Sequence, residues 1–253
     1  MARTRTYSKI RVASRALALA SILTGVALPA SSQDVERLLR EWLATQREAV
    51  AGVASVTLDE TTRISVDGGF GRQTLVAGAV RTVGPSEGPG SHEIVRMELN
   101  GSEIAFERGE RFRRQQRGLW RPEIGRMMES FRFPVRDFGR MRMARAVMDE
   151  SPDGRAAWRI DVVPRAMPDP VERMTAWFEP AEFRLILTES ILRAPSARPV
   201  RVRTWYERFR GIDMPVEVRA EGSSRMRRRM RFFTTLFEIE TIYSSHAVDF
   251  VEP

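Results

Sequence analysis

Few residues in this chain have the types and spacing that acid-base or metal chemistry needs. There are two histidines, His92 and His246, and no cysteine. A zinc or other transition-metal site would have to consist almost wholly of carboxylates, which are not the ligand set these ions favour. The sequence also lacks the Gly-x-x-x-x-Gly-Lys loop that cradles phosphates. We therefore predict no metal and no cofactor.

The nearest approach to catalytic machinery is the sequence Ser-Ser-His-Ala-Val-Asp at residues 244–249. It holds the residue types of a hydrolase triad, but side chains crowded into one strand end cannot converge on one point. The Gly-x-Ser-x-Gly turn of many hydrolases is absent. Glu238 and Glu240 would share one face of a strand, and a solvated face is the simpler interpretation than a glycosidase pair. The sequence predicts a protein that is not an enzyme.

The densest charge lies in residues 225–231, Arg-Met-Arg-Arg-Arg-Met-Arg. In a strand, alternation would place four arginines on one face: Arg225, Arg227, Arg229 and Arg231. One interpretation is a solvated edge that discourages aggregation. The other is a docking site for anionic lipid headgroups or for an acidic protein partner, with peripheral membrane contact.

Residues 1–32 have the pattern of a secretory signal peptide. Five basic residues lie within residues 3–15, an apolar stretch follows at 16–26, and small residues occupy 30–32. The apolar stretch is too short to span a bilayer as a helix. We predict cleavage after Ser32, with Ala30 as the second choice and an uncleaved anchor as the alternative. Losing five basic and no acidic residues lowers the formal charge from +8 to +3, which does not indicate nucleic-acid binding.

Two amphipathic helices are predicted in the remaining single domain, residues 33–253. The first covers residues 34–50, where apolar side chains recur at the spacing of one helix face: Val35, Leu38, Leu39, Trp42 and Leu43. The second is a short insert that begins near Pro122 and ends before Pro134, with Trp120 leading into it. Its apolar stripe consists of Ile124, Met127, Met128 and Phe131.

Most of the other residues alternate between apolar and polar, which predicts strands that bury one face. Asn100-Gly101 is the strongest hairpin signal, with a return strand expected over 102–106. The last three strands are expected to form a long meander with turns at 211–213 and 221–224. In all we expect about eleven antiparallel strands. A sheet of this size needs apolar cover on its inner face, and the two helices can supply it.

Three stretches resemble the bacterial lipoprotein-localisation-factor superfamily, whose members include the carrier LolA and the acceptor LolB. The hairpin at 141–164, with its Asp153-Gly154 turn, is similar to the central hairpin of that superfamily. The sequence Trp-Phe-Glu-Pro-Ala-Glu-Phe-Arg-Leu at 177–185 resembles its pair of strands joined by an acidic turn. Gly-Ile-Asp-Met-Pro at 211–215, followed by a late Tyr243, is similar to its closing strands.

The resemblance implies a mainly β (α+β) fold, a curved antiparallel half-barrel sheet with helices covering its concave face. It further implies an apolar cavity for acyl chains of lipoproteins or other lipids, and a periplasmic, monomeric carrier. An envelope sensor or scaffold of the same fold, which binds a protein partner, is the alternative. Flexible methionines and aromatic rings suit such a cavity. The expected lining residues are Leu39, Trp42, Trp120, Met127, Met128, Phe131, Trp158, Trp177 and Trp205. For any single one of them, a place in the ordinary core is the simpler interpretation.

Overall fold

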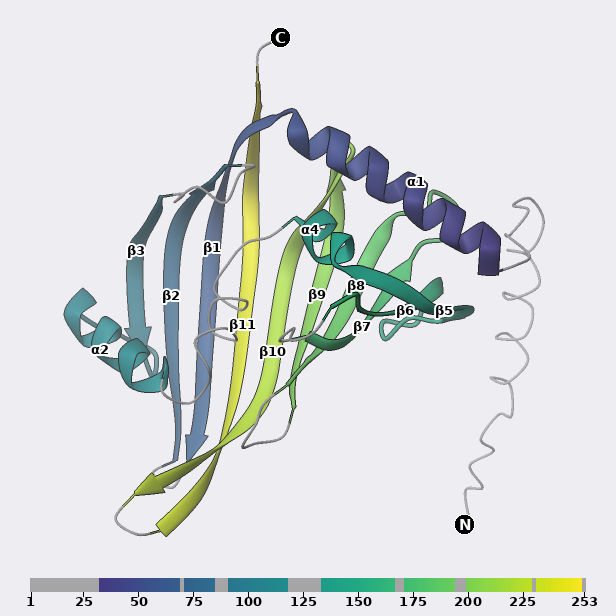
Figure 1. Cartoon of the computed structure of the whole chain (residues 1–253). Helices are drawn as coiled ribbons and strands as arrows, with labels where there is room; N and C mark the ends of the chain where they lie inside the picture. Colours follow the sequence, from purple (N-terminus) through teal and green to yellow (C-terminus); the bar gives the residue numbers. More distant parts are fainter. Residues whose placement is uncertain are drawn as a thin grey trace, which may run out of the picture.

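The computed structural model describes residues 32–68, 71–84, 91–117, 133–166, 171–193, 199–228 and 231–251. Within these residues the chain forms one open antiparallel sheet of eleven strands (Figure 1). The predicted fold class and number of strands are confirmed. Among the described residues, no helix is both long enough and apolar enough to cross a membrane.

The described helices are α1 (Ser32–Ala51), α2 (Phe106–Arg117) and α4 (Pro134–Gly139). The strands, in chain order, are β1 (Val53–Gly68), β2 (Gly71–Val83), β3 (His92–Leu99), β4 (Ser102–Glu103), β5 (Met141–Glu150), β6 (Ala156–Pro164), β7 (Val171–Phe178), β8 (Leu185–Leu192), β9 (Val200–Phe209), β10 (Ile212–Arg228) and β11 (Arg231–Phe250).

The sheet consists of two meanders joined through β1 and β11. The spatial order is β4-β3-β2-β1-β11-β10-β9-β8-β7-β6-β5. The first and last strands of the chain therefore lie side by side, with Ile64 opposite Ile239 in the register of that pair. This pairing of distant segments leaves the short β4 at one edge of the sheet and β5 at the other.

One face of the curved sheet, which we call the inner face, carries the apolar core. Figure 1 shows α1 and α4 lying across this face, while α2 lies beside β3. Val35 and Trp42 of α1, Phe138 of α4 and Phe178 of β7 belong to one buried cluster. The opposite, outer face has no such helical cover among the described elements. The amphipathic stripe that predicted α1 is thus the face that packs on the sheet.

The structure corrects two predicted strand ends. The expected turn at 221–224 is wrong, because β10 continues to Arg228, which pairs with Arg231 across the hairpin. A Cβ atom on Gly222 would lie 2.6 Å from Cζ of Phe237, so this glycine makes room for a ring on the neighbouring strand. The expected strand over 102–106 ends at Glu103, and α2 begins at Phe106.

The region around Pro134 also differs from the expectation. Pro134 was expected to end a helix, whereas it begins α4, where a proline fits because the first turn needs no N–H donor. The helix predicted between Pro122 and Pro134 lies outside the described residues.

Candidate functional site: the helix-covered inner face

A row of small and hydroxyl-bearing side chains crosses the middle of the inner face. Cross-strand pairs join it from β7 to β2 through Ala176, Thr188, Thr204, Val218, Thr241, Thr62 and Ala77. Beside it runs a mostly apolar row: Leu75, Ile64, Ile239, Ala220, Val202, Ser190, Met174 and Val162. The hydroxyls of Thr62 and Thr241 lie 3.0 Å apart and bond to each other. Neither row carries a charged side chain, so this part of the inner face is mostly apolar, as an acyl-binding surface needs.

Methionines of β5 and β7 belong to the inner face. Met141 and Met174 are buried in the core cluster, and Met143 packs against it while partly exposed. Methionine has three rotatable bonds and a polarizable sulfur, so it adapts to irregular apolar partners. These side chains can change shape at little energetic cost.

Aromatic rings fill the space between α1, α4 and the sheet. The ring of Trp42 meets those of Phe138 and Phe178 edge-on, with centroids 5.0 and 5.1 Å away. Phe178 also stacks on Phe183, with 4.6 Å between centroids. Edge-on and offset pairs at such separations add to the stabilisation from burial itself. This end of the inner face is closely packed.

A buried carboxylate, Asp213 at the start of β10, fastens α1 to the sheet. Its side chain is fully buried, and its Oδ2 accepts a 2.7 Å hydrogen bond from Nε1 of Trp42. Nε of Arg208 donates to Oδ1 at 2.9 Å, and the backbone N–H of Leu185 donates to Oδ2 at 3.2 Å. The Gln46 side chain bonds to the backbone on both sides, accepting from the N–H of Asp213 and donating to the carbonyl of Gly211, each at 2.8 Å. A buried charge needs such compensation.

A second polar cluster lies on the inner face of β1, β2 and β3. Glu60 is buried, with Nε of Arg81 at 2.5 Å and Nε2 of His92 at 3.7 Å from its carboxylate oxygens. These residues line an enclosed space of about 30 Å³ together with Arg113 of α2. That volume suits one or two water molecules and no acyl chain. Burial, reinforced by the charge of Glu60, raises the pKa of the neighbouring Tyr243.

Helix α2 approaches the sheet closely beside this cluster. A Cβ atom on Gly109 would lie only 2.1 Å from Sδ of Met97 on β3, so glycine permits the contact. Phe112, one turn later, is buried in the same core cluster as Trp42. The inner face is thus covered by α2 at one side and by α1 and α4 at the other.

The residues predicted to line the cavity do not all share one face. Trp42 and Trp158 are buried on the inner face, and Leu39 packs there while partly exposed. Trp177 and Trp205 pack with Leu187 in a separate cluster on the outer face. Because neighbouring residues of a strand point to opposite faces, Trp177 faces outward where Phe178 faces inward. The three sheet tryptophans therefore do not form one wall.

The remaining predicted site residues lie outside the residues whose side chains the structure describes. Arg225 and Arg227 belong to β10 and Arg231 begins β11, but only their backbone is described. The others in this group are Trp120, Met127, Met128, Phe131 and Arg229.

The candidate catalytic residues are not assembled. Asp249 accepts a 2.8 Å hydrogen bond from Ser55, and Nε2 of His246 is buried without a hydrogen-bond partner among the described residues. Glu238 lies 3.2 Å from Arg72, and Glu240 lies 3.7 Å from Arg63, both on the outer face. No group of three or more potential metal ligands occurs in the described part of the chain.

Sequence reasoning missed both buried polar clusters. Asp213 lies in the run Gly-Ile-Asp-Met-Pro, where an aspartate is typical of a turn. Its partners are 171 residues away at Trp42 and 167 residues away at Gln46. Glu60 interrupts the apolar side of an otherwise alternating strand, and that interruption was the only signal available.

Comparisons with known proteins give likeness of structure alone. No family model and no curated protein sequence matches the chain. An outer membrane lipoprotein-sorting protein domain from Vibrio parahaemolyticus is 12% identical with a TM-score of 0.41, over 82% of this chain and 91% of that one. A LolA superfamily protein from Nitrosomonas europaea is 10% identical with a TM-score of 0.37, over 84% and 94%.

A DUF1329 family protein from Desulfovibrio piger is 10% identical with a TM-score of 0.36, over 84% of this chain and 93% of that one. At such identities only the arrangement of strands is comparable. The resemblance expected from the sequence is thus found at the level of fold. The chain is similar in structure to LolA superfamily and outer-membrane lipoprotein-sorting proteins.

Proposed function

We propose that this chain is an exported lipid-binding protein of the bacterial envelope, which holds acyl chains against its inner face. The supporting observation is one curved sheet whose apolar inner face is covered by α1 and α4 instead of a second sheet. Helices that lie on a sheet can move aside without breaking the hydrogen bonds between its strands. The signal-peptide pattern of residues 1–32 supports export to the periplasm.

The way in for a ligand lies under the first half of α1. Trp42 and Gln46 fasten the second half to β10 through hydrogen bonds, whereas Leu38 and Leu39 are held by apolar contacts and stay partly exposed. An acyl chain entering between Leu39 and Met143 replaces one set of apolar contacts by another. The hydrogen bonds to Asp213 remain intact and keep the second half of α1 in place.

Ligand identification is the direct test. Protein purified from an envelope fraction is analysed by native mass spectrometry and by lipid extraction. We expect a bound species that carries acyl chains. Protein that is free of lipid and takes up none from added fatty acid or phospholipid contradicts the proposal.

A variant pair on α1 tests the position of the ligand. Leu39→Gln places an amide where the acyl chain passes, and the amide loses water without a partner. We expect roughly tenfold weaker uptake of a fluorescent fatty acid, because such burial costs about 1–3 kcal/mol. Glu41→Gln, on the exposed side of the same helix, is the matched control. Equal uptake by both variants contradicts this position.

The alternative function, a sensor or scaffold that binds a protein partner, is separable by experiment. It depends on the arginine run at 225–231. If the protein acts by binding a protein partner, charge reversal in this run should abolish capture of the partner and leave fatty-acid uptake intact. Loss of uptake in Leu39→Gln together with unchanged partner capture favours the lipid-binding function.

A further inference from the structure

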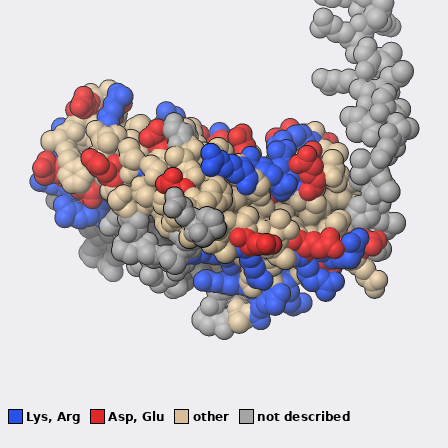
Figure 2. Space-filling model, turned by 90° about the horizontal axis from the view of Figure 1, so that it is seen from above, with Lys and Arg blue, Asp and Glu red and all other residues tan. Residues whose placement is uncertain are grey.

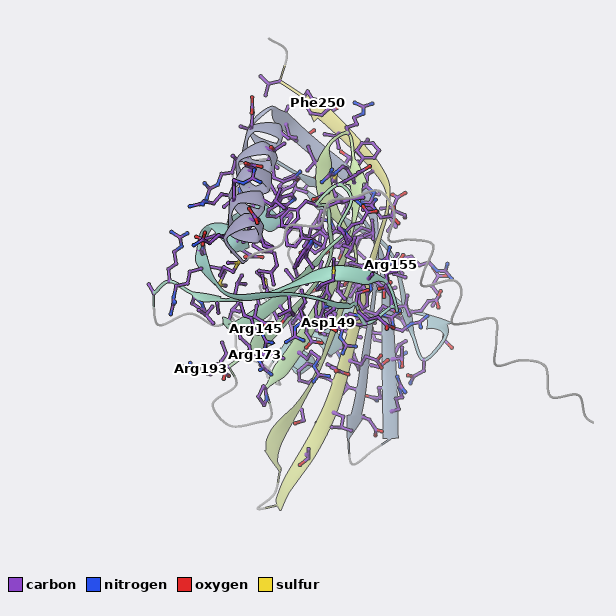
Figure 3. All side chains as sticks on the ribbon, turned by 90° about the vertical axis from the view of Figure 1, so that its right-hand side faces the viewer. Arg145, Asp149, Arg155, Arg173, Arg193 and Phe250 are labelled. Atoms are coloured by element: carbon purple, nitrogen blue, oxygen red, sulfur yellow. The ribbon has the colours of Figure 1, made fainter. Side chains whose placement is uncertain are left out.

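Among the outer-face arginines without an ion pair in the described part of the chain are Arg145 on β5, Arg173 on β7 and Arg193 just after β8. All three side chains are exposed. Figure 3 shows them on the same side of the sheet, with Asp149 and Arg155 further along the β5–β6 hairpin. They form what we call the arginine corner.

The strand register places these residues close together. Arg145 is opposite Asp161, which is opposite Thr175, and Arg173 lies two residues before Thr175 on the same face. Arg173 is in turn opposite Ile191, two residues before Arg193. Arg173 and Arg193 are thus diagonal neighbours on adjacent strands, about 7–8 Å apart, and Arg145 lies on the other side of β6 from Arg173. The corner thus extends over four adjacent strands.

Three of the acidic residues around the corner pair with other arginines, whereas Glu150 and Glu172 are exposed without an ion pair in the described part of the chain. Asp149 lies 2.7 Å and Asp161 lies 3.3 Å from Arg159, and Asp161 also accepts a bond from Thr175. Glu189 lies 2.8 Å from Arg203 and 3.7 Å from Arg201. None of the three arginines of the corner forms an ion pair with these carboxylates, although Glu150 lines the same groove as Arg173.

The shape of the corner favours an extended anionic surface over a single small anion. Arg173 lies where two open grooves of about 700 and 480 Å³ meet on the outer face. Both grooves are open to the surface, and the three arginines extend from different strands instead of converging on one point. Such an array responds to a density of negative charge, to which each basic side chain contributes separately.

We propose that the arginine corner docks the outer face onto a bilayer surface rich in anionic phospholipid headgroups. The opposite, inner face and its helices stay clear of this contact. The inference does not depend on what the inner face binds, since it concerns different residues on the other side of the sheet. Each arginine near such a surface contributes about 1 kcal/mol, or roughly fivefold in partitioning.

The test is co-sedimentation of the purified chain with vesicles. One set is phosphatidylcholine alone, and the other is an equal mixture with phosphatidylglycerol. We expect binding to the mixed vesicles only, weakened by high salt because ions screen exposed charges. The triple variant R145Q/R173Q/R193Q should bind on the order of a hundredfold more weakly. All variants begin at Gln33, after the predicted cleavage site, so the basic residues of 3–15 do not contribute to vesicle binding.

Two further triple variants make the result decisive. R63Q/R72Q/R219Q removes the same charge from outer-face arginines that are ion-paired, and we expect less than about a threefold change. R145K/R173K/R193K keeps the charge and should keep most of the binding. Loss of binding in the lysine variant indicates a guanidinium-specific anion site and overturns the proposal. Equal loss in the control triple, or no binding to mixed vesicles, overturns it too.

Discussion

The two faces of the sheet satisfy their polar groups in opposite ways. On the inner face, Asp213 is fully buried and hydrogen-bonded to Trp42, Arg208 and the backbone of Leu185. On the outer face, charges form cross-strand pairs open to water, such as Arg72 with Glu238, whose side chains are 62% and 59% exposed. Figure 2 shows acidic and basic residues interspersed over the surface seen from above.

This difference teaches which polar contacts fix the fold. A buried charge that loses one partner stays desolvated, so the remaining charge is strongly unfavourable. An exposed charge that loses its partner is solvated by water, so little is lost. We therefore expect the same kind of substitution to have large effects on the inner face and small ones on the outer face.

The largest expected effect is that of Asp213→Ala. It leaves the indole N–H of Trp42, the Arg208 guanidinium and the N–H of Leu185 without their acceptor. We expect the free energy of unfolding to fall by about 3–5 kcal/mol in urea denaturation. Glu238→Ala on the outer face should lower it by less than about 1 kcal/mol. Similar losses in the two variants would remove the distinction between the faces.

A glycine pair tests the same distinction through packing. Gly222→Ala on the inner face brings a methyl group to within 2.6 Å of the Phe237 ring and 3.1 Å of Val200. Overpacking of this kind lowers the free energy of unfolding by about 1–3 kcal/mol. Gly78→Ala on the outer face meets nothing closer than 3.7 Å, so its midpoint of thermal unfolding should stay near that of the parent. A tolerated Gly222→Ala would contradict the close packing of Phe237.

The titration of Tyr243 gives a smaller, pH-dependent effect. Burial raises its pKa above the ordinary value of about 10. The folded state therefore keeps the phenol proton where the unfolded chain loses it. The contribution of this proton to the free energy of unfolding is complete below pH about 10. Above that pH the free energy of unfolding falls by about 1.4 kcal/mol per pH unit.

Urea denaturation between neutral pH and pH about 11 measures this slope. Burial also raises the pKa of Tyr206, so Tyr243→Phe should reduce the slope and the double variant Tyr206→Phe/Tyr243→Phe should remove most of it. A slope that is unchanged in Tyr243→Phe would show that Tyr243 does not contribute.

The smallest effect is expected at Asp149 on the outer face. The backbone N–H of Glu150 and the guanidinium of Arg159 donate to its carboxylate and lower its pKa. Asp149 therefore favours the folded state at neutral pH, and this contribution fades as the pH falls through the lowered pKa. Arg159→Gln should raise that pKa toward the ordinary value, as measured by NMR titration. Arg155→Gln, which removes a partner of Asp153 instead, is the control.

Local patterns in the sequence predicted the elements that lie on a single periodic stretch. The stripe of Val35, Leu38 and Trp42 predicted α1, and alternation predicted most strands. The same patterns predicted the wrong structure where contact with a residue on another strand determines whether a strand continues or turns. Gly222 is indistinguishable from a turn glycine until the Phe237 ring is placed against it.

The choice between faces was equally beyond the sequence in places. Trp158, Trp177 and Trp205 are alike in composition and in their alternating surroundings, yet Trp158 alone of them faces inward. A shift of one residue in a strand reverses the face, and only pairing with neighbouring strands fixes that shift. The alternation therefore predicted that each tryptophan lies on one face of a strand, but not which face that is.

By itself the sequence determined that this chain forms a long antiparallel sheet with an amphipathic helix at its start, because periodicity is a local property of the chain. Tertiary structure alone decided that β1 lies beside β11, that Asp213 fastens α1, and that three exposed arginines gather on the outer face without an ion pair among the described residues. Each of these depends on contacts between residues far apart in the chain. Strand register and sheet curvature determine those contacts, and no short stretch of the sequence shows them.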